Sequence, residues 1–310
     1  MRVLYFCGRI VSMRYNRLNE YYKAKFGERT LKICVDGGFS CPNRDGTKGV
    51  GGCAFCSEDG SGEHIKCKDI ATQVRQHLNS YRGQRANKYI VYFQNFSNTY
   101  ADVTTLKQKY DSALISDKIV GLDIATRPDL ITQEIVDLLA TYKSKYYVMV
   151  ELGLQTANAN IAKDMNMQYT VQDYITACKL LHSAGIDIVT HIMLGLPGET
   201  TKDIDDTINI VNQYTDGIKI HNLYIVKNTK CAELYKQNKI TILTLDEYLI
   251  KLEYVLERLR PNVVIHRICG DAPKDLLIAP EWNTHKKFVL NGIDKLMKQH
   301  NSTQGDKYKK

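Results

Sequence analysis

Three cysteines lie within sixteen residues in the stretch CPNRDGTKGVGGCAFC, at Cys41, Cys53 and Cys56. Two thiols separated by two residues are typical of cysteines that bind one metal centre. The eleven residues between Cys41 and Cys53 are rich in glycine, so the backbone can wrap closely around a bulky ligand. The spacing therefore indicates a centre held by three thiolates, without an obvious fourth ligand.

Three kinds of centre are compatible with these thiols. A structural zinc ion needs a fourth ligand, which His64 or Cys67 could supply. A disulfide conflicts with a chain that is neither short nor visibly secreted. An iron–sulfur cluster that leaves one iron open for a substrate or cofactor fits three thiols best.

The rest of the chain alternates between predicted strands and amphipathic helices, which predicts βα units and a parallel sheet, either open or closed into a barrel. Ile204, Ile208 and Val211 share one face of a helix that begins near a capping box of Thr200 and Asp203. The predicted strands are mostly apolar at every position, as strands buried on both faces are. They are 30–35, 88–96, 118–126, 146–154, 186–195, 217–225 and 262–269.

The cysteine stretch comes directly after the first predicted strand, 30–35. In parallel α/β folds, the chemistry takes place on the loops that follow the C-terminal ends of strands. The three cysteines are therefore expected where an active site belongs.

Composition narrows the functional classes only slightly. The 310 residues carry 42 Lys and Arg against 34 Asp and Glu, a net charge of +8, which permits an anionic partner such as nucleic acid. Arg75, Arg82, Arg85 and Lys88 could contact a phosphate backbone, although an ordinary solvated helix face explains them as well. There is no run of eighteen apolar residues, so we expect no membrane span and a cytoplasmic location.

The cysteine stretch, with an aromatic residue at Phe55, resembles the radical S-adenosylmethionine (radical SAM) enzymes. The long spacing before the CxxC pair narrows the resemblance to the YhcC/YtqA family, which is similar to the elongator catalytic subunit and to oxygen-independent coproporphyrinogen oxidase. The resemblance covers residues 14–297. The other matching stretches are YFQNFSNTYAD, ATRPD, VELGLQT, HIMLGLPGET, KIHNLYIVKNT and VIHRICGDAP.

This resemblance implies a partial (β/α)6 TIM-type barrel with a C-terminal α/β extension. Cys41, Cys53 and Cys56 would hold a [4Fe–4S] cluster that binds and cleaves S-adenosylmethionine, with flavodoxin or ferredoxin as a one-electron donor. The expected division is an N-terminal arm (1–29), the barrel (30–240), the extension (241–300) and a flexible basic tail (301–310).

The resemblance also suggests residues for cofactor binding. Phe55 should pack near the adenine or the cluster, unless it is a plain core aromatic. The Gly-Gly-Glu-like motif of the superfamily is missing, because its place reads FQNFSNTY. Its role must then fall on Gln94, Asn95, Asn98 or Thr99, of which we favour Asn98 and Thr99.

Further polar residues are assigned by the same resemblance and by strand alternation. Arg127 could bind a carboxylate or phosphate, or pair with Asp129. Glu151 and Gln155 lie on one side of a strand and could contact the ribose or amine of the cofactor, or form a supporting polar network. The turn expected to let the backbone approach the adenine contains Gly195, Pro197 and Gly198.

The substrate is the least determined part. His191, Lys219 and His221 could reach it from two strands, although a structural role would also explain them. The basic balance and the resemblance favour tRNA, with conversion of the carboxymethylaminomethyl group of wobble uridine to aminomethyl. The alternatives are a radical SAM enzyme acting on a small metabolite or cofactor, and a non-catalytic zinc-binding protein.

Overall fold

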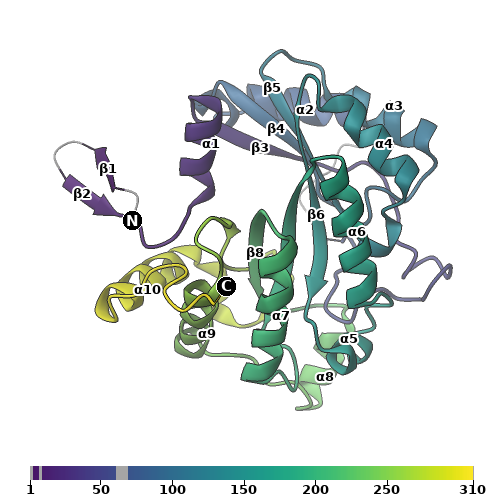
Figure 1. Cartoon of the computed structure of the whole chain (residues 1–310). Helices are drawn as coiled ribbons and strands as arrows, with labels where there is room; N and C mark the ends of the chain where they lie inside the picture. Colours follow the sequence, from purple (N-terminus) through teal and green to yellow (C-terminus); the bar gives the residue numbers. More distant parts are fainter. Residues whose placement is uncertain (1–2, 7–8, 61–68, 310) are drawn as a thin grey trace.

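Seven parallel strands form one curled, half-barrel sheet in a computed structural model that describes residues 3–6, 9–60 and 69–309 (Figure 1). Their spatial order is β10-β8-β7-β6-β5-β4-β3. Each of the seven predicted runs overlaps one of them, and only β6 extends beyond its run, by one residue, so the predicted α/β class and strand set are confirmed. The strands are β3 (Thr30–Val35), β4 (Lys88–Phe93), β5 (Ile119–Thr126), β6 (Tyr147–Gln155), β7 (Asp187–Leu194), β8 (Gly217–Asn222) and β10 (Val264–Arg267).

The remaining strands form two small antiparallel pairs. β1 (Val3–Phe6) pairs with β2 (Arg9–Ser12), and β9 (Ile225–Val226) pairs with β11 (Leu277–Ala279). Helices connect the strands of the main sheet and form the C-terminal part. They are α1 (Leu18–Phe26), α2 (Ile70–Asn79), α3 (Val103–Ala113), α4 (Gln133–Tyr142), α5 (Ala159–Asp164), α6 (Val171–Ser183), α7 (Thr201–Tyr214), α8 (Lys230–Lys236), α9 (Leu245–Arg258) and α10 (Lys286–Gln299).

The helix starts follow from local hydrogen bonding. Thr200 and Asp203 form the predicted capping box at the start of α7, since each side chain bonds to the backbone N–H of the other residue. Thr132 caps α4 through the N–H of Ile135. These caps satisfy N–H groups that have no partner within the helix.

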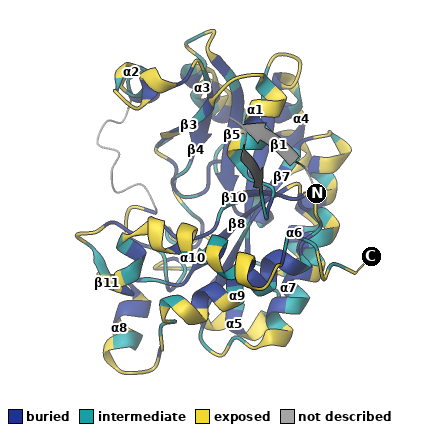
Figure 2. Cartoon of the chain, turned by 90° about the vertical axis from the view of Figure 1, so that its left-hand side faces the viewer, coloured by how far each residue is buried: buried dark blue, intermediate teal, exposed yellow. Residues whose placement is uncertain are grey.

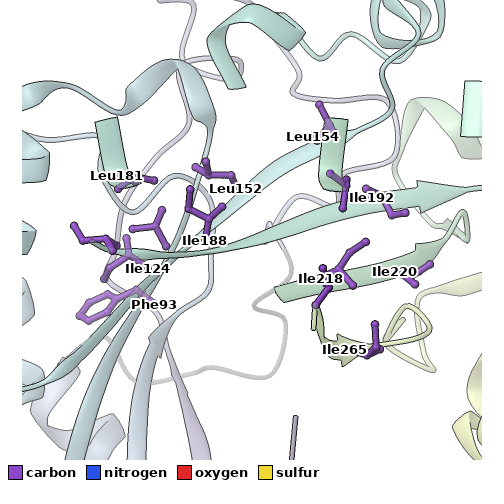
Figure 3. Close-up of a cluster of buried hydrophobic side chains, with 14 of the residues drawn as sticks. Phe93, Ile124, Leu152, Leu154, Leu181, Ile188, Ile192, Ile218, Ile220 and Ile265 are labelled. Atoms are coloured by element: carbon purple, nitrogen blue, oxygen red, sulfur yellow. The ribbon is translucent and has the colours of Figure 1, made fainter. Parts of the chain in front are cut away.

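The convex side of the sheet carries the main hydrophobic core. Helices α2, α3, α4, α6 and α7 lie along this side (Figure 1), and the strands beneath them are buried (Figure 2). Figure 3 shows part of this core, where Leu181 of α6 lies close to strand residues. Among the labelled residues are Phe93, Ile124, Leu152, Ile188, Ile218 and Ile265.

Helix α1 closes the N-terminal end of the half-barrel. It contacts both edge strands, β3 and β10. Its Tyr22 packs with Ile90, Met149 and Val189. These residues of β4, β6 and β7 alternate along their strands with residues of the convex side, so they face the concave side of the sheet. Part of the predicted N-terminal arm therefore belongs to the barrel core.

The C-terminal residues differ from the prediction of a flexible basic tail. Ser302 and Gln304 are buried, and the N–H of Gln304 donates to the carbonyl of Arg14 at 2.8 Å. The N–H of Lys307 donates to the carbonyl of Glu257 at 2.8 Å. Because α9 and the N-terminal segment supply these partners, residues 301–309 lie against the fold. The division at residue 240 stays a prediction.

Candidate active site

The cysteine stretch follows the C-terminal end of β3, as predicted. A tight turn joins Cys53 and Cys56, with the N–H of Cys56 donating to the carbonyl of Cys53 at 2.9 Å. Between them, Ala54 donates to the carbonyl of Met165 and accepts from the N–H of Cys231, both at 2.9 Å. The CxxC pair is thereby fixed to two other parts of the chain.

Cys41, Cys53 and Cys56 are free thiols that line one cavity of about 200 Å³. Burial, followed by the neighbouring Cys56, raises the pKa of Cys53 to about 12. Within the described residues, no three Cys, His, Asp or Glu side chains are close enough to hold a single metal ion. A cluster is larger than one ion and needs its thiolates farther apart, so three thiols on one cavity wall fit a cluster better than zinc.

His64 and Cys67, the suggested fourth zinc ligands, lie outside the described residues. The remaining described cysteines are Cys34, Cys178, Cys231 and Cys269. Cys178 is buried on the apolar side of α6. Cys34 instead lines the cavity described next.

A second cavity, of about 600 Å³, adjoins the first and shares part of its wall. It continues toward α1 and the end of α2, where Tyr22 and Arg82 line it. A ligand in this cavity would reach the cysteines across the shared wall. The shared residues are Phe55, Cys56, Tyr92, Gln94, Gln155, His191, Lys219, His221 and Arg267.

A buried network of charges crosses the interior between β3, β5, β6 and β8. Lys32 donates to Asp123 and, at 2.8 Å, to Glu151. Lys219 donates to the other oxygen of Glu151 and, at 3.0 Å, to the hydroxyl of Tyr92. Two lysines and two acidic side chains therefore satisfy one another's hydrogen-bonding groups away from water.

The network shifts the pKa values of its members. Burial raises the pKa of Glu151, but Lys219, Lys32 and His191 outweigh this effect and hold it well below its usual value. Burial and the nearby Glu151 raise the pKa of Asp123 to about 8. Burial also lowers the pKa of Lys219 to about 8.

His191 and His221 line both cavities, as the substrate prediction requires. Nε2 of His191 lies 2.7 Å from Glu151, and the two imidazole rings are 5.3 Å apart. Burial lowers the pKa of His191 and, with His191 and Arg267 nearby, holds that of His221 well below its usual value. Lys219 also lines both cavities but is buried rather than solvated.

The structure does not bring Asn98 and Thr99 to the cavities. Nδ2 of Asn98 donates to the carbonyls of Phe93 and Ala125, and the Thr99 hydroxyl lies 2.6 Å from that of Thr126. Both residues connect the ends of β4 and β5 and are buried, so the preference for them as cofactor ligands finds no support. Gln94, the alternative from the same stretch, lines both cavities.

Arg127 borders the smaller cavity but has partners of its own. Its Nε and Nη2 donate to the two carboxylate oxygens of Asp129, both at 2.9 Å. Its remaining bonds go to the carbonyls of Met167 and Gln168. The ion pair with Asp129 is therefore the role that the geometry favours.

Phe55 and Gln155 lie on the shared wall, and Glu151 borders the smaller cavity. The turn formed by Gly195, Pro197 and Gly198 is not among the described residues that line either cavity. A side chain at Gly195 would come within 2.8 Å of Leu243, at a φ of +83°, so packing already explains this glycine.

Sequence reasoning missed several inward-facing residues. A signal was present, because each is a polar residue inside an otherwise apolar strand. Strand alternation alone cannot say which side faces a cavity when both sides are buried. The residues are Lys32, Cys34, Tyr92, Asp123, His266 and Arg267. No helix in the described part of the chain is long and apolar enough to cross a membrane.

The chain is similar to known proteins over nearly its whole length. It is 39% identical to YtqA of Bacillus subtilis over 94% of this chain and 92% of that protein. It is 34% identical to YhcC of Escherichia coli K12 over 89% of this chain and 90% of that protein. The yeast Elongator complex protein 3 is 27% identical over 52% of this chain, which spans only 29% of that protein.

A solved structure of archaeal Elp3 from Methanocaldococcus infernus has the same fold, with a TM-score of 0.67 at 16% identity. The match covers 89% of this chain and 64% of that one. Family models for the radical SAM superfamily and the radical SAM C-terminal domain match residues 44–211 and 215–299. The first range includes Cys53 and Cys56, and Cys41 lies just before it. The chain is therefore a radical SAM enzyme of the YtqA/YhcC family, with a [4Fe–4S] cluster and S-adenosylmethionine as its cofactors.

Proposed function

We propose that this enzyme acts on tRNA, and that it converts the carboxymethylaminomethyl group of a wobble uridine to aminomethyl. Cys41, Cys53 and Cys56 would hold the cluster. When bound, the cofactors supply a 5′-deoxyadenosyl radical that can remove a hydrogen atom from a substrate carbon. The expected target is the glycine-derived carbon: loss of one hydrogen atom and then of one electron, which the oxidised cluster could accept, would give an imine, and water would hydrolyse its C–N bond to leave the aminomethyl group and release glyoxylate.

The observation that best supports this proposal is the cation-rich wall of the cavity beside the cysteines. Among the described residues that line the larger cavity, five carry a positive charge and only Asp271 carries a carboxylate. Such a wall favours a substrate group with a negative charge, which the carboxymethylaminomethyl group has. The positive residues are Lys32, Arg82, Lys219, Arg267 and Lys286.

A basic surface continues outward from this cavity. Arg82 lines the cavity and is exposed, and Arg75 and Arg85 are exposed nearby in the sequence. Lys88 is different, because its ammonium donates to the carbonyl of Phe26 at 2.7 Å. The three arginines are therefore the better candidates for contacts with a phosphate backbone.

Product analysis would test the proposal directly. The enzyme is purified without oxygen, reconstituted with iron and sulfide, and incubated with dithionite, S-adenosylmethionine and tRNA that carries the carboxymethylaminomethyl group. Mass spectrometry should detect aminomethyluridine and 5′-deoxyadenosine with the native enzyme, and neither with Cys53→Ala. Release of 5′-deoxyadenosine that tRNA does not stimulate, with no change in the tRNA, would favour a small-metabolite substrate instead.

Binding of tRNA can be tested separately from chemistry. Changing Arg75, Arg82 and Arg85 together to Gln should weaken tRNA binding and reduce the salt dependence by about one counterion per lost phosphate contact. A matched control neutralises three exposed lysines on other helices, Lys107, Lys202 and Lys230. An equal loss in both variants would show that the arginine surface has no special role.

A further inference from the structure

Arg267 ends the edge strand β10 and lies on the wall that both cavities share. In the parallel ladder it is the register partner of Lys219 on β8. Its side chain is therefore accessible from both cavities, including the one that the three cysteines line.

The guanidinium of Arg267 makes no hydrogen bond and no ion pair with any residue that the structure describes. Other cations on the same wall do have partners. Lys219 donates to Glu151 and to the Tyr92 hydroxyl, and Lys286 pairs with Asp271. Arg267 is half-buried, and a guanidinium has five N–H donors, so a ligand in the cavities could accept hydrogen bonds from it.

Arg127 shows how this chain can satisfy a guanidinium with its own residues. Its donors go to both oxygens of Asp129 and to two carbonyls. The two carboxylates that act electrostatically on Arg267, Asp271 and Glu151, already pair with lysines. Glu151 accepts from Lys32 on one oxygen and from Lys219 and His191 on the other, and Asp271 accepts from Lys286.

We propose that Arg267 binds the carboxylate of the substrate through two parallel N–H···O bonds. This inference rests on the proposed function, which supplies a carboxymethylamino group. Lys219, the register partner of Arg267, adds a second positive charge to the same wall. Arg267 is thus a substrate-binding residue that orients the glycine-derived carbon toward the cofactor.

The test compares two nucleosides, 5-carboxymethylaminomethyluridine and 5-aminomethyluridine, which differ in the group that bears the carboxylate. Their binding to reconstituted enzyme with S-adenosylmethionine, but without reductant, is measured by calorimetry. Native enzyme should prefer the carboxylated nucleoside by at least about tenfold, the value of one charge-assisted hydrogen-bonded pair. Arg267→Gln should abolish this preference and leave 5-aminomethyluridine binding unchanged. Arg267→Lys should restore part of it, because the charge returns without the planar pair of donors.

Arg29→Gln is the matched control, because Arg29 is exposed and is not among the described residues that line either cavity. Thermal unfolding checks the fold, and Arg267→Gln should not lower Tm because no ion pair is lost. If Arg267→Gln weakens S-adenosylmethionine and spares the carboxylated nucleoside, the guanidinium binds the methionine carboxylate, and the proposal is overturned.

A third probe separates this inference from the proposed function. N-methylglycine carries the carboxymethylamino head without a nucleoside. Binding of N-methylglycine that depends on Arg267, with neither nucleoside bound, would support the carboxylate site and contradict the tRNA function. The opposite result is also informative. If the native enzyme forms the expected tRNA product, and the Arg267→Gln variant still prefers the carboxylated nucleoside, the proposed function is supported and Arg267 is not the carboxylate-binding residue.

Discussion

The two sides of the same parallel strands differ completely in character. On the convex side, Leu152, Ile188 and Ile218 are buried against helices with no polar atom among their side chains. On the concave side, neighbouring residues of the same strands, Glu151 and Lys219, form a buried ion pair. Packing stabilises the first side, whereas the second side carries a desolvation cost that charge pairing only offsets. The difference indicates that the concave side is maintained for binding and chemistry.

The concave side is itself divided along the barrel axis. At the N-terminal end, Tyr22 of α1 packs on Met149 and Val189. One layer higher lies the charge network around Glu151, and above it lie the cysteines. The apolar layer seals one end, so ligands must enter from the cavity side.

The largest expected effect is at the centre of the network. Glu151→Gln keeps the shape but leaves Lys32 and Lys219 without their shared carboxylate. We expect a loss of about 3–5 kcal/mol in the free energy of unfolding, measured by urea denaturation. Glu233→Gln, in the exposed pair with Lys230, is the control and should have no measurable effect. Equal effects at the two positions would remove the distinction between the network and the surface.

The neighbouring residue tests the convex side. Leu152→Ala should cost about 2–5 kcal/mol, because the side chain is fully buried and a cavity remains. S-adenosylmethionine affinity, measured by calorimetry on the reconstituted enzyme, should stay unchanged in the variant. A large loss of cofactor affinity would show that the two sides are not independent.

Carboxylate binding should depend on pH near 8. Lys219 and Asp123 both have pKa values of about 8, so raising the pH neutralises the ammonium and ionises the carboxyl group. Both changes remove positive charge, so affinity for 5-carboxymethylaminomethyluridine should fall up to about tenfold between pH 7 and 9. The other titratable groups that face this interior do not change charge over most of this pH range, because their pKa values are shifted away from it. The groups that stay charged are Lys32, Arg267 and Glu151. The groups that stay neutral are His191, His221, His266, Tyr92 and Cys34.

That pH dependence has its own control. The affinity for 5-aminomethyluridine, which has no carboxylate, should not fall in parallel. A flat pH profile for the carboxylated nucleoside would argue that Lys219 and Asp123 do not influence the site.

The smallest effect is expected in the apolar layer. Among the described residues, the Tyr22 hydroxyl donates only to the sulfur of Met149, at 3.9 Å, and sulfur is a weak acceptor. Tyr22→Phe should therefore change the free energy of unfolding by less than about 1 kcal/mol, measured by thermal unfolding. A loss of several kcal/mol would mean that the Tyr22 hydroxyl stabilises this layer. The apolar layer and the charged layer would then not differ in the way described above.

The sequence by itself determined the strands, the helix caps and the cysteine loop. These features depend on neighbours in the chain: apolar runs, a Thr and Asp three residues apart, and two thiols separated by two residues. The sequence could not show which residue of the FQNFSNTY stretch faces the cavities, because Asn98 and Gln94 are chemically similar and only their surroundings separate them.

Only the tertiary structure decided which polar strand residues meet. Lys32 and Glu151 are far apart in the chain, and the curl of the sheet brings their side chains into contact. It also gives Arg127 a carboxylate partner and leaves Arg267 facing a cavity. Local pattern cannot distinguish these two arginines, because the energy of a buried charge depends on partners that distant strands supply.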